Sequence, residues 1–395
     1  MPLSRVAKSS SSSQPHKPAV PLLDLHRQYN QIREEILTAI ERVCSSQQFV
    51  LGKEVEALER EVAAFTNAAA AVGCASGTDA LWLALVSAGV QPGDAVITTA
   101  FSFFASASAI VRAGARPVFA DVDSETLNIS AKSVRNLLEG CSYKVRALLP
   151  VHLYGQCAEM DALREIAEEF HIGLIEDAAQ AIGAKLRGQS AGSLGVSAAF
   201  SFYPTKNLSA YGDAGLVTTL DVNMAQRMRN LRNHGSPQRY YHEEIGWNCR
   251  MDAIQAAVLR VKLRYIEKWN DQRRARADSY DDMLKEAALV GNTENSPIRL
   301  LERTPDAHHV FHQYVVRAED RDELRAFLTE HQIGTEIYYP IPLHLQPAFS
   351  YLGYAEGDLP ESERAAQEVL ALPMFPELTE DEQKWVVARM AEFYS

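Results

Sequence analysis

The stretch VRALLPVHLYGQCAEMDALREIAEEFHIGLIED, residues 145–177, decides the fold class of this chain. It begins with one apolar run, 145–151, and ends with another, 173–177, and both have the length and composition of a buried strand. Between them, residues 158–170 form a helix-like segment. A strand, a helix and a strand in this order predict parallel strands joined by a helical crossover.

The same alternation continues in both directions from this unit. Strand-like runs lie at 69–74, 95–99 and 116–122, and helix-like segments lie at 79–87, 105–112 and 130–138. Two amphipathic helices precede them, within 29–46 and around 55–65. We predict an α/β fold with a mainly parallel central sheet covered by helices on both faces. Because ligands of such sheets lie at the carboxyl ends of the strands, the loops after strands should carry the site.

The C-terminal part predicts a second, smaller α/β domain. After short strands at 197–203 and 215–220, one long helix is expected from Asp252 to about Lys285, as a connector between domains. A strand at 310–317, a helix at 321–331, a strand at 334–338, a proline-rich loop at 340–347 and two closing helices should follow. We expect a large domain over 21–265, a small domain over 266–395, and a disordered tail over the serine-rich and proline-rich residues 1–20.

Composition excludes several classes of protein. The 395 residues carry 51 acidic and 39 basic side chains, a formal net charge of −12, which disfavours nucleic-acid binding because phosphate neutralisation requires clustered Lys and Arg. No run approaches the ~18 consecutive apolar residues of a membrane helix. The five cysteines form no C-x-x-C pair, so we expect reduced, mostly buried thiols, no metal site and a cytoplasmic protein.

Two residues at predicted strand ends suggest a cofactor. Lys206 follows an apolar strand, where a lysine can have a lowered pKa and attack an aldehyde, although its position is also compatible with an ordinary surface lysine. Asp177 ends a strand that should be buried, so its carboxylate needs a donor or a cation; it could also be a helix N-cap. Pyridoxal phosphate chemistry requires this pair: a lysine for the Schiff base and an acid that keeps the pyridine nitrogen protonated.

A third segment suggests a phosphate site. In Cys74-Ala-Ser-Gly-Thr-Asp79, small polar residues separate a strand from a helix. The free N–H groups of a helix N-terminus, with the hydroxyl of Thr78, would bind a phosphate, while Ser76 is also compatible with a plain N-cap. The chain has no G-x-G-x-x-G sequence and no Walker lysine, so neither a dinucleotide site nor an NTPase loop is indicated.

With these residues the chain resembles the DegT/StrS-type sugar aminotransferases, pyridoxal phosphate enzymes of the aspartate aminotransferase-like fold, fold type I. The resemblance runs from about Pro21 to the C-terminus. It is carried by ordered motifs: Leu22-Leu-Asp-Leu, Phe49-Val-Leu-Gly, Ser76-Gly-Thr-Asp-Ala-Leu, His152-Leu-Tyr-Gly-Gln, Glu176-Asp-Ala-Ala-Gln, Ser201-Phe-Tyr-Pro-Thr-Lys, Leu231-Arg-Asn-His-Gly, Asn248-Cys-Arg-Met-Asp, Gln255-Ala-Ala, Pro342-Leu-His-Leu-Gln-Pro-Ala-Phe and Leu372-Pro-Met.

The resemblance implies a role for each matched site residue. Lys206 would form the Schiff base with pyridoxal 5'-phosphate, and Asp177 would pair with the pyridine nitrogen. The remaining implied contacts are the phosphate with Gly77, Thr78 and Ser201, the ring face with Phe103, the ring hydroxyl with Gln180, and the phosphate of the other subunit with Asn248. Phe103 is also compatible with an ordinary core position. The implied assembly is a homodimer with shared active sites.

The implied reaction is transamination of a nucleotide-linked keto sugar, with L-glutamate as amino donor. Tyr240-Tyr-His-Glu-Glu-Ile-Gly is similar to members that act on 3-keto sugars, so we favour a 3-keto over a 4-keto substrate. The dehydratase variant of the family has histidine in place of the lysine, so Lys206 argues against it. A non-catalytic, pyridoxal phosphate-binding regulatory protein is the alternative. One departure, Tyr338 where His often precedes a Tyr-Pro pair, affects only contacts on the substrate side.

Overall fold

The computed structural model describes residues 19–140, 142–291 and 296–395. The tail predicted over 1–20 therefore lies outside the described residues, except for its last two. Val20 corrects that boundary, because it is fully buried, forms a parallel bridge with Ile333, and donates its N–H to the Gln332 carbonyl at 2.9 Å. Cys141 also lies outside the described residues, and the other four cysteines are free thiols, of which Cys44 alone is exposed.

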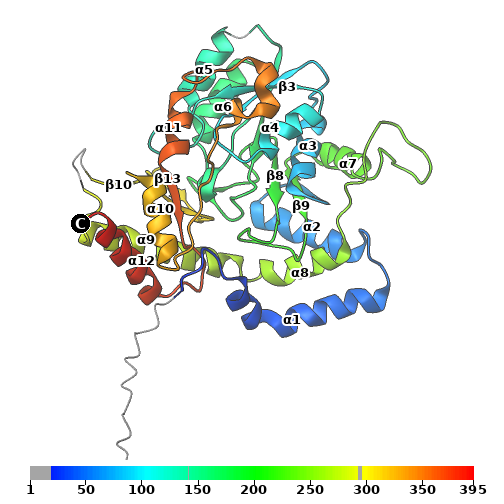
Figure 1. Ribbon diagram of the computed structural model, residues 1–395. Helices are drawn as coiled ribbons and strands as arrows, with labels where there is room; N and C mark the ends of the chain where they lie inside the picture. The colour runs from blue at the N-terminus through cyan, green and yellow to red at the C-terminus, as the bar shows by residue number, and fades with distance from the viewer. Residues whose placement is uncertain (1–18, 141, 292–295) are drawn as a thin grey trace, which may run out of the picture.

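A seven-stranded sheet forms the centre of the molecule (Figure 1). Its strands follow the order β1 (Ala70–Cys74), β9 (Gly215–Thr219), β8 (Ser197–Ser201), β5 (Gly173–Asp177), β4 (Val145–Leu149), β2 (Ala95–Thr99) and β3 (Arg116–Ala120). Only β9 pairs antiparallel to its neighbours, β8 and β1, and every other pairing is parallel. The predicted mainly parallel sheet is confirmed, and the predicted strands match to within two residues at each end.

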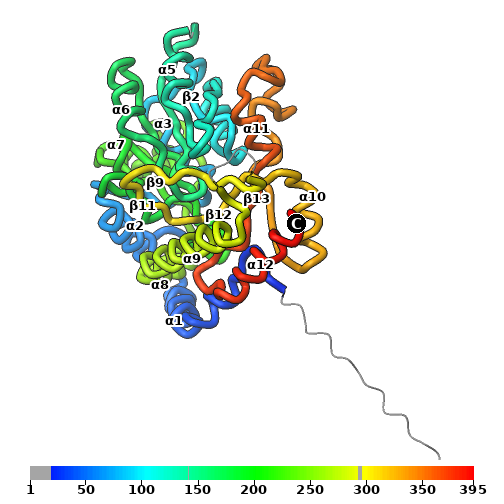
Figure 2. The backbone as a smooth tube through the Cα atoms, turned by 90° about the vertical axis from the view of Figure 1, so that its left-hand side faces the viewer, coloured from blue at the N-terminus to red at the C-terminus, as the bar shows by residue number. Residues whose placement is uncertain are grey.

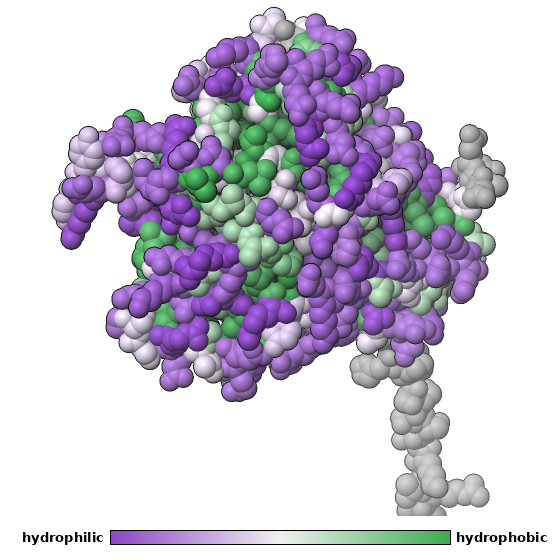
Figure 3. Space-filling model, turned by 180° about the vertical axis from the view of Figure 1, so that it is seen from behind, coloured by the Kyte–Doolittle hydropathy of each residue, from purple (hydrophilic) through white to green (hydrophobic). Residues whose placement is uncertain are grey.

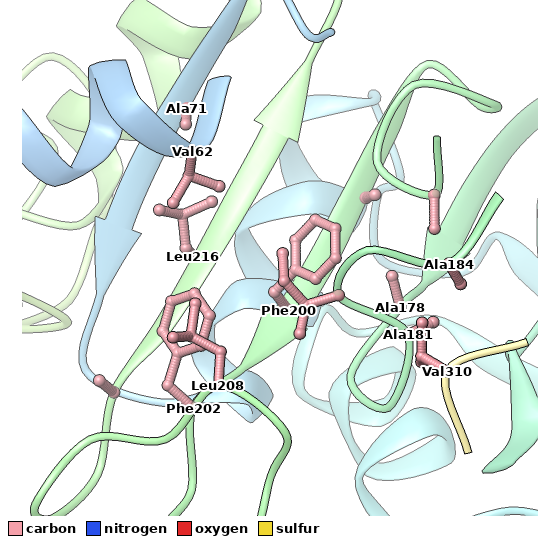
Figure 4. Close-up of a cluster of buried hydrophobic side chains, with 14 of the residues drawn as sticks. Val62, Ala71, Ala178, Ala181, Ala184, Phe200, Phe202, Leu208, Leu216 and Val310 are labelled. Atoms are coloured by element: carbon pink, nitrogen blue, oxygen red, sulfur yellow. The ribbon is translucent and has the colours of Figure 1, made fainter. Parts of the chain in front are cut away.

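Helices cover both faces of this sheet, because successive strand residues point to opposite sides. On β8, Ala199 packs with α3 (Gly77–Ser87), α4 (Ala105–Arg112) and α7 (Val222–Leu231). Its neighbour Phe200 joins the opposite core, where it lies beside Leu216 of β9 (Figure 4). That core includes residues of α1 (Leu25–Ser46), α2 (Lys53–Thr66), α5 (Ala131–Gly140), α6 (Met160–Glu169) and α8 (Ala253–Leu263).

A smaller antiparallel sheet lies beside the central sheet and its helices (Figure 2). It consists of β10 (Ile298–Leu300), β12 (Tyr314–Ala318) and β13 (Val369–Leu372), and shares a second core with α9 (Ile266–Glu286), α10 (Arg321–Glu330), α11 (Pro360–Glu368) and α12 (Glu380–Phe393). A third sheet of short strands joins β6 (Lys185–Leu186), β7 (Gln189–Ser190) and β11 (Ala307–His308). The 3-10 helices are η1 (Leu153–Gly155), η2 (Leu343–Leu345) and η3 (Pro347–Leu352).

The single connector helix predicted from Asp252 to Lys285 is wrong, because α8 ends at Leu263 and α9 begins at Ile266. The break lets α9 serve two cores: Ile266 and Trp269 pack with the central sheet, and Tyr280 and Leu284 pack with the small sheet. The domain boundary that we place between 265 and 266 thus coincides with the start of a shared helix. It stays a prediction.

Three further differences occur in the C-terminal part. The strand predicted at 334–338 is a single bridge, Glu336 with Ala371, because the Gly334 N–H bonds instead to Val20. The strand predicted at 310–317 begins only at Tyr314, since Phe311 has a left-handed φ of 41° that interrupts an extended run. β13 lies unpredicted between the two closing helices, because a four-residue apolar run after a helix has no distinguishing period.

Candidate active site

A cavity of about 640 Å³ lies between the carboxyl ends of the central strands and the small sheet. The central part contributes the loops after β1, β2, β5 and β8, and the C-terminal part contributes residues at 312–313, 338–339 and 371–374. Seven of the eight predicted site residues line it: Gly77, Thr78, Phe103, Asp177, Gln180, Ser201 and Lys206. The structure thus brings these residues together, while their individual roles stay predictions.

The N-terminus of α3 forms one wall of the cavity. Ser76 is the N-cap, with its hydroxyl accepting the Asp79 N–H at 3.1 Å, as one of the two interpretations of the sequence had it. First-turn N–H groups have no acceptor inside a helix, so those of Gly77 and Thr78 are available to an anion. A Cβ at Gly77 would lie 2.6 Å from the Ser201 Cβ, so only glycine lets the helix approach that serine so closely.

Asp177 is the last residue of β5 and is 3% exposed. Its Oδ2 accepts the Ser106 hydroxyl at 2.7 Å, and its Oδ1 accepts the Ala179 N–H at 3.2 Å. Burial raises the pKa of Asp177, while these hydrogen bonds and the Lys206 charge act in the opposite direction. No helix begins after Asp177, so the N-cap alternative is wrong, and the carboxylate has capacity for a further donor in the cavity.

The preceding residue, Glu176, faces the other side of the sheet and is structural. Its carboxylate accepts the backbone N–H groups of Gly192, Leu194 and Gly195 at 2.8–2.9 Å. The His152 Nε2 lies 2.9 Å from the same carboxylate. Because the His152 Nδ1 accepts the Ala158 N–H, the ring proton is on Nε2, which donates it to Glu176. Of the two adjacent acidic residues, Glu176 therefore stabilises the fold, and Asp177 lines the cavity.

Lys206 lies in the turn after β8, with its N–H donating to the Tyr203 carbonyl at 2.8 Å. It is partly buried in the cavity wall, so the surface-lysine alternative is wrong. Burial lowers the pKa of Lys206 to about 8, and the charge of Asp177 opposes that shift. The two groups thus interact through space across the cavity, and a substantial fraction of the Lys206 amine is neutral near physiological pH.

Two aromatic residues flank these charges. Gln180 donates from Nε2 to the Tyr339 hydroxyl at 3.1 Å and accepts the Tyr154 N–H, so its amide is held rigidly. Phe103 is 59% exposed and its ring centroid lies 6.2 Å from that of Tyr339. Phe103 is therefore not an ordinary core residue, and its exposed aromatic ring lines the cavity.

His312 is a cavity residue that sequence reasoning missed. The His312 Nδ1 lies 3.2 Å from the Asn207 Oδ1, and the Asn207 amide donates to the Asn270 Oδ1 at 2.9 Å. Burial and the positive charges of Lys206 and Arg273 hold the pKa of His312 well below its usual value, so the ring is neutral. The histidine-rich run 308–312 was the available signal, but its placement beside Lys206 required the fold.

Asn248 lies outside the cavity, at the base of an arm formed by residues 234–247. It is exposed and bridges Asn233, and the arm projects from the body between α7 and α8 (Figure 1). From behind, the arm is also seen to stand away from the rest of the surface (Figure 3). Four of its large apolar residues are at least half exposed: Tyr240, Tyr241, Ile245 and Trp247.

The described residues contain neither a metal-binding cluster nor a membrane-spanning helix. Over 19–140, 142–291 and 296–395, no group of three or more His, Cys, Asp or Glu side chains is placed to hold a metal ion. In the same ranges no helix combines the length and apolar character needed to cross a membrane.

Comparisons with known proteins agree with this geometry. The model of the DegT/DnrJ/EryC1/StrS aminotransferase family matches residues 30–391. A "pleiotropic regulatory protein" of Geobacillus stearothermophilus is 50% identical, over 95% of this chain and 98% of the relative. A UDP-N-acetyl-3-dehydro-alpha-D-glucosamine 3-aminotransferase of Acidithiobacillus ferrooxidans is 42% identical, over 94% and 96%. The crystal structure of S. venezuelae DesV with a ketimine intermediate is 44% identical, covers 95% of this chain and 98% of its own, and superposes with a TM-score of 0.90.

Proposed function

The chain belongs to the DegT/DnrJ/EryC1/StrS aminotransferase family, which depends on pyridoxal phosphate, and on that premise we propose its substrates. The proposed reaction converts a nucleotide-linked keto sugar to an amino sugar, with L-glutamate as amino donor. The observation that carries the proposal is the cavity itself, in which a lysine with a lowered pKa interacts with a buried carboxylate beside a helix N-terminus.

The residues of the cavity fit the cofactor. The α3 N-terminus and Ser201 would hold its phosphate, because the absence of a Cβ at Gly77 lets their donors converge. The Asp177 carboxylate, whose pKa is raised by burial, suits a protonated ring nitrogen as partner. Phe103 would cover one ring face, and Gln180 would lie near the ring hydroxyl.

When bound, pyridoxal phosphate supplies an electron sink for the substrate carbon that loses its proton. Asp177 would keep the ring nitrogen protonated, and the hydrogen bonds from Ser106 and Ala179 fix the orientation of its carboxylate. Lys206 would be the nucleophile that attaches the cofactor. Once released, its Nζ would move a proton between the substrate carbon and the cofactor carbon, as general base and then as general acid, since its lowered pKa permits both states near neutral pH.

A 3-keto sugar is the proposed substrate. The Acidithiobacillus relative is named for a 3-dehydro sugar, and a second relative, from Streptomyces venezuelae, is named dTDP-3-amino-3,4,6-trideoxy-alpha-D-glucose transaminase at 43% identity. These names, together with Tyr240-Tyr-His-Glu-Glu-Ile-Gly in the arm, support transfer to carbon three of a nucleoside diphosphate sugar.

The proposed assembly is a homodimer in which Asn248 reaches the phosphate site of the partner. Support comes from the projecting arm, because exposed tyrosine, isoleucine and tryptophan side chains on one segment are typical of a surface that another chain covers. A position outside the cavity of its own chain is consistent with this role of Asn248.

A second candidate is a regulatory protein that binds the cofactor without turnover, and the Geobacillus relative is named a pleiotropic regulatory protein. The cofactor spectrum separates the two. If the protein is a transaminase, glutamate changes the visible band of the loaded protein, and addition of a keto sugar nucleotide restores it. A band that does not respond to glutamate would favour the regulator.

A panel of 3-keto and 4-keto sugar nucleotides, assayed by coupled glutamate consumption, tests the substrate. We expect turnover with a 3-keto sugar and none in Lys206→Ala, which should stay folded because its residue lies in a turn and contributes little core area. Turnover close to wild type in Lys206→Ala would contradict the mechanism, and preference for a 4-keto sugar would contradict the proposed position.

A further inference from the structure

Arg273 of α9 lies in the wall of the cavity and is 3% exposed. Its Nη1 donates to the carbonyls of Phe311, His312 and Met374 at 3.1–3.3 Å. Its Nε is buried without a hydrogen-bond partner, and the described residues provide no acceptor for Nη2 either. These two nitrogens form one edge of the guanidinium, the edge that arginine uses to bind a carboxylate through two parallel hydrogen bonds.

The guanidinium of Arg273 also forms no ion pair with a carboxylate in the part of the chain that the structure describes. The other buried arginines of the described residues each pair with a carboxylate: Arg232 with Glu59 at 2.5 Å, Arg317 with Glu368 at 2.8 Å and Arg321 with Asp322 at 2.7 Å. Arg273 is opposed only at a distance, by Glu377.

Burial lowers the pKa of Arg273 to about 10, so the group stays a cation at neutral pH. Glu377 offsets this positive charge only in part, because burial raises the pKa of Glu377 and so disfavours its ionised form. A buried charge without a partner is unfavourable, and a ligand that brings an anion to it recovers that free energy.

Arg273 and Lys206 are both near His312. His312 lies close enough to both Lys206 and Arg273 for each positive charge to lower its pKa. The next residue, Gln313, lines the same cavity and has a buried side-chain oxygen without a partner. An unpaired cation and an unpaired acceptor therefore line the same cavity as Lys206, where each can bind a polar group of a ligand.

We propose that Arg273 binds a carboxylate of the amino-donor substrate. This contact would position the donor amine near Lys206. This inference rests on the proposed function. The same chemistry would also hold an acidic group on the sugar, so the test includes both kinds of substrate. The planar fork of arginine suits a carboxylate, whereas the neutral hydroxyls of a sugar do not require a buried cation.

The test uses the cofactor-loaded protein and succinate, a dicarboxylate without an amine. In the wild type, succinate binds in calorimetry and competes with glutamate. Arg273→Gln should weaken succinate binding and raise the KM for glutamate about 10- to 100-fold, the loss expected for hydrogen bonds to a charged group. The KM for a keto sugar nucleotide without a carboxylate on its sugar should not change.

Arg274→Gln is the matched control. It removes the same charge from the next residue, whose guanidinium instead contacts Asp271 and His308, and it should leave succinate binding and both KM values unchanged. Arg273→Lys should lie between the wild type and Arg273→Gln, because an ammonium keeps the charge but loses the fork. If Arg273→Gln changes the KM only for sugars that carry a carboxylate, Arg273 binds the carboxylate of the sugar and not that of the amino donor.

The proposal is overturned if folded Arg273→Gln binds succinate as the wild type does. Should that variant fail to fold, the wild type decides, because succinate that competes with neither glutamate nor an acidic sugar also overturns it. Failure of the proposed function has a different signature. In that case the wild type turns over no keto sugar, whatever the succinate titration shows.

Discussion

The lowered pKa of Lys206 makes a quantitative prediction about cofactor uptake. At pH 7.5, an amine with a pKa of about 8 is roughly one-quarter neutral, against about one part in a thousand at the ordinary value of 10.5. Only the neutral amine attacks an aldehyde. Covalent uptake of pyridoxal phosphate by the cofactor-free protein should therefore rise with pH and reach half of its maximum near pH 8.

The sign of the Asp177 contribution can be tested in the same experiment. The negative charge of Asp177 raises the pKa of Lys206 and so opposes the effect of burial. Asp177→Asn removes that charge, so the half-maximal pH of uptake should move to a lower value. A shift to higher pH would show that the two residues do not interact as the structure has them.

The assay is stopped-flow absorbance of the cofactor band over about pH 6 to pH 10. Lys262 offers a matched control, because burial also lowers the pKa of Lys262 to about 8, but its Nζ donates to Ser209 outside the cavity. Lys206→Met should abolish covalent uptake, and Lys262→Met should leave the profile unchanged. A profile with its midpoint near pH 10, or covalent uptake in Lys206→Met, would refute the reasoning.

Three further predictions concern turnover, the phosphate site and assembly. Asp177→Asn should lower turnover at least about 100-fold, since the ring nitrogen loses its partner, while the phosphate contacts still retain cofactor; an unchanged rate in the folded variant would remove Asp177 from the mechanism. Gly77→Ala should weaken cofactor binding about 10-fold or more in an equilibrium titration, because its Cβ would lie 2.6 Å from that of Ser201, whereas Gly140→Ala, with open space around it, should not. Asn248→Ala should weaken both cofactor retention and the dimer in sedimentation over a concentration series; a fully loaded, active monomer would contradict the shared site.

Much of the central fold follows from local pattern. The runs at 95–99 and 173–177 match β2 and β5 residue for residue, because short apolar segments between helices and polar loops have few other buried arrangements. The C-terminal part was harder to predict. β13 has four residues and β10 has three, and at such lengths the choice between strand and loop depends on which neighbour offers hydrogen bonds.

The site residues likewise include some that the sequence could indicate and others that only the folded structure brings together. Lys206, Asp177 and Gly77 could be chosen from the sequence because each lies at or after the end of a strand, and parallel strands bring their carboxyl ends to one edge. Ser106 could not be chosen, since its hydroxyl meets Asp177 across 71 residues of chain. Tyr339 reaches Gln180 across 159 residues, and no local period encodes such a contact.

The sequence by itself therefore determined the α/β class and the approximate strand ends, and it marked Lys206 and Asp177 as candidate site residues, because periodicity and residue chemistry are properties of neighbours along the chain. Only the tertiary structure decided that α9 breaks from α8, that His312 and Arg273 face the cavity, and that burial lowers the pKa of Lys206. The physical reason is that burial and electrostatic fields are sums over groups distant in sequence, and these groups acquire their distances only when the chain folds.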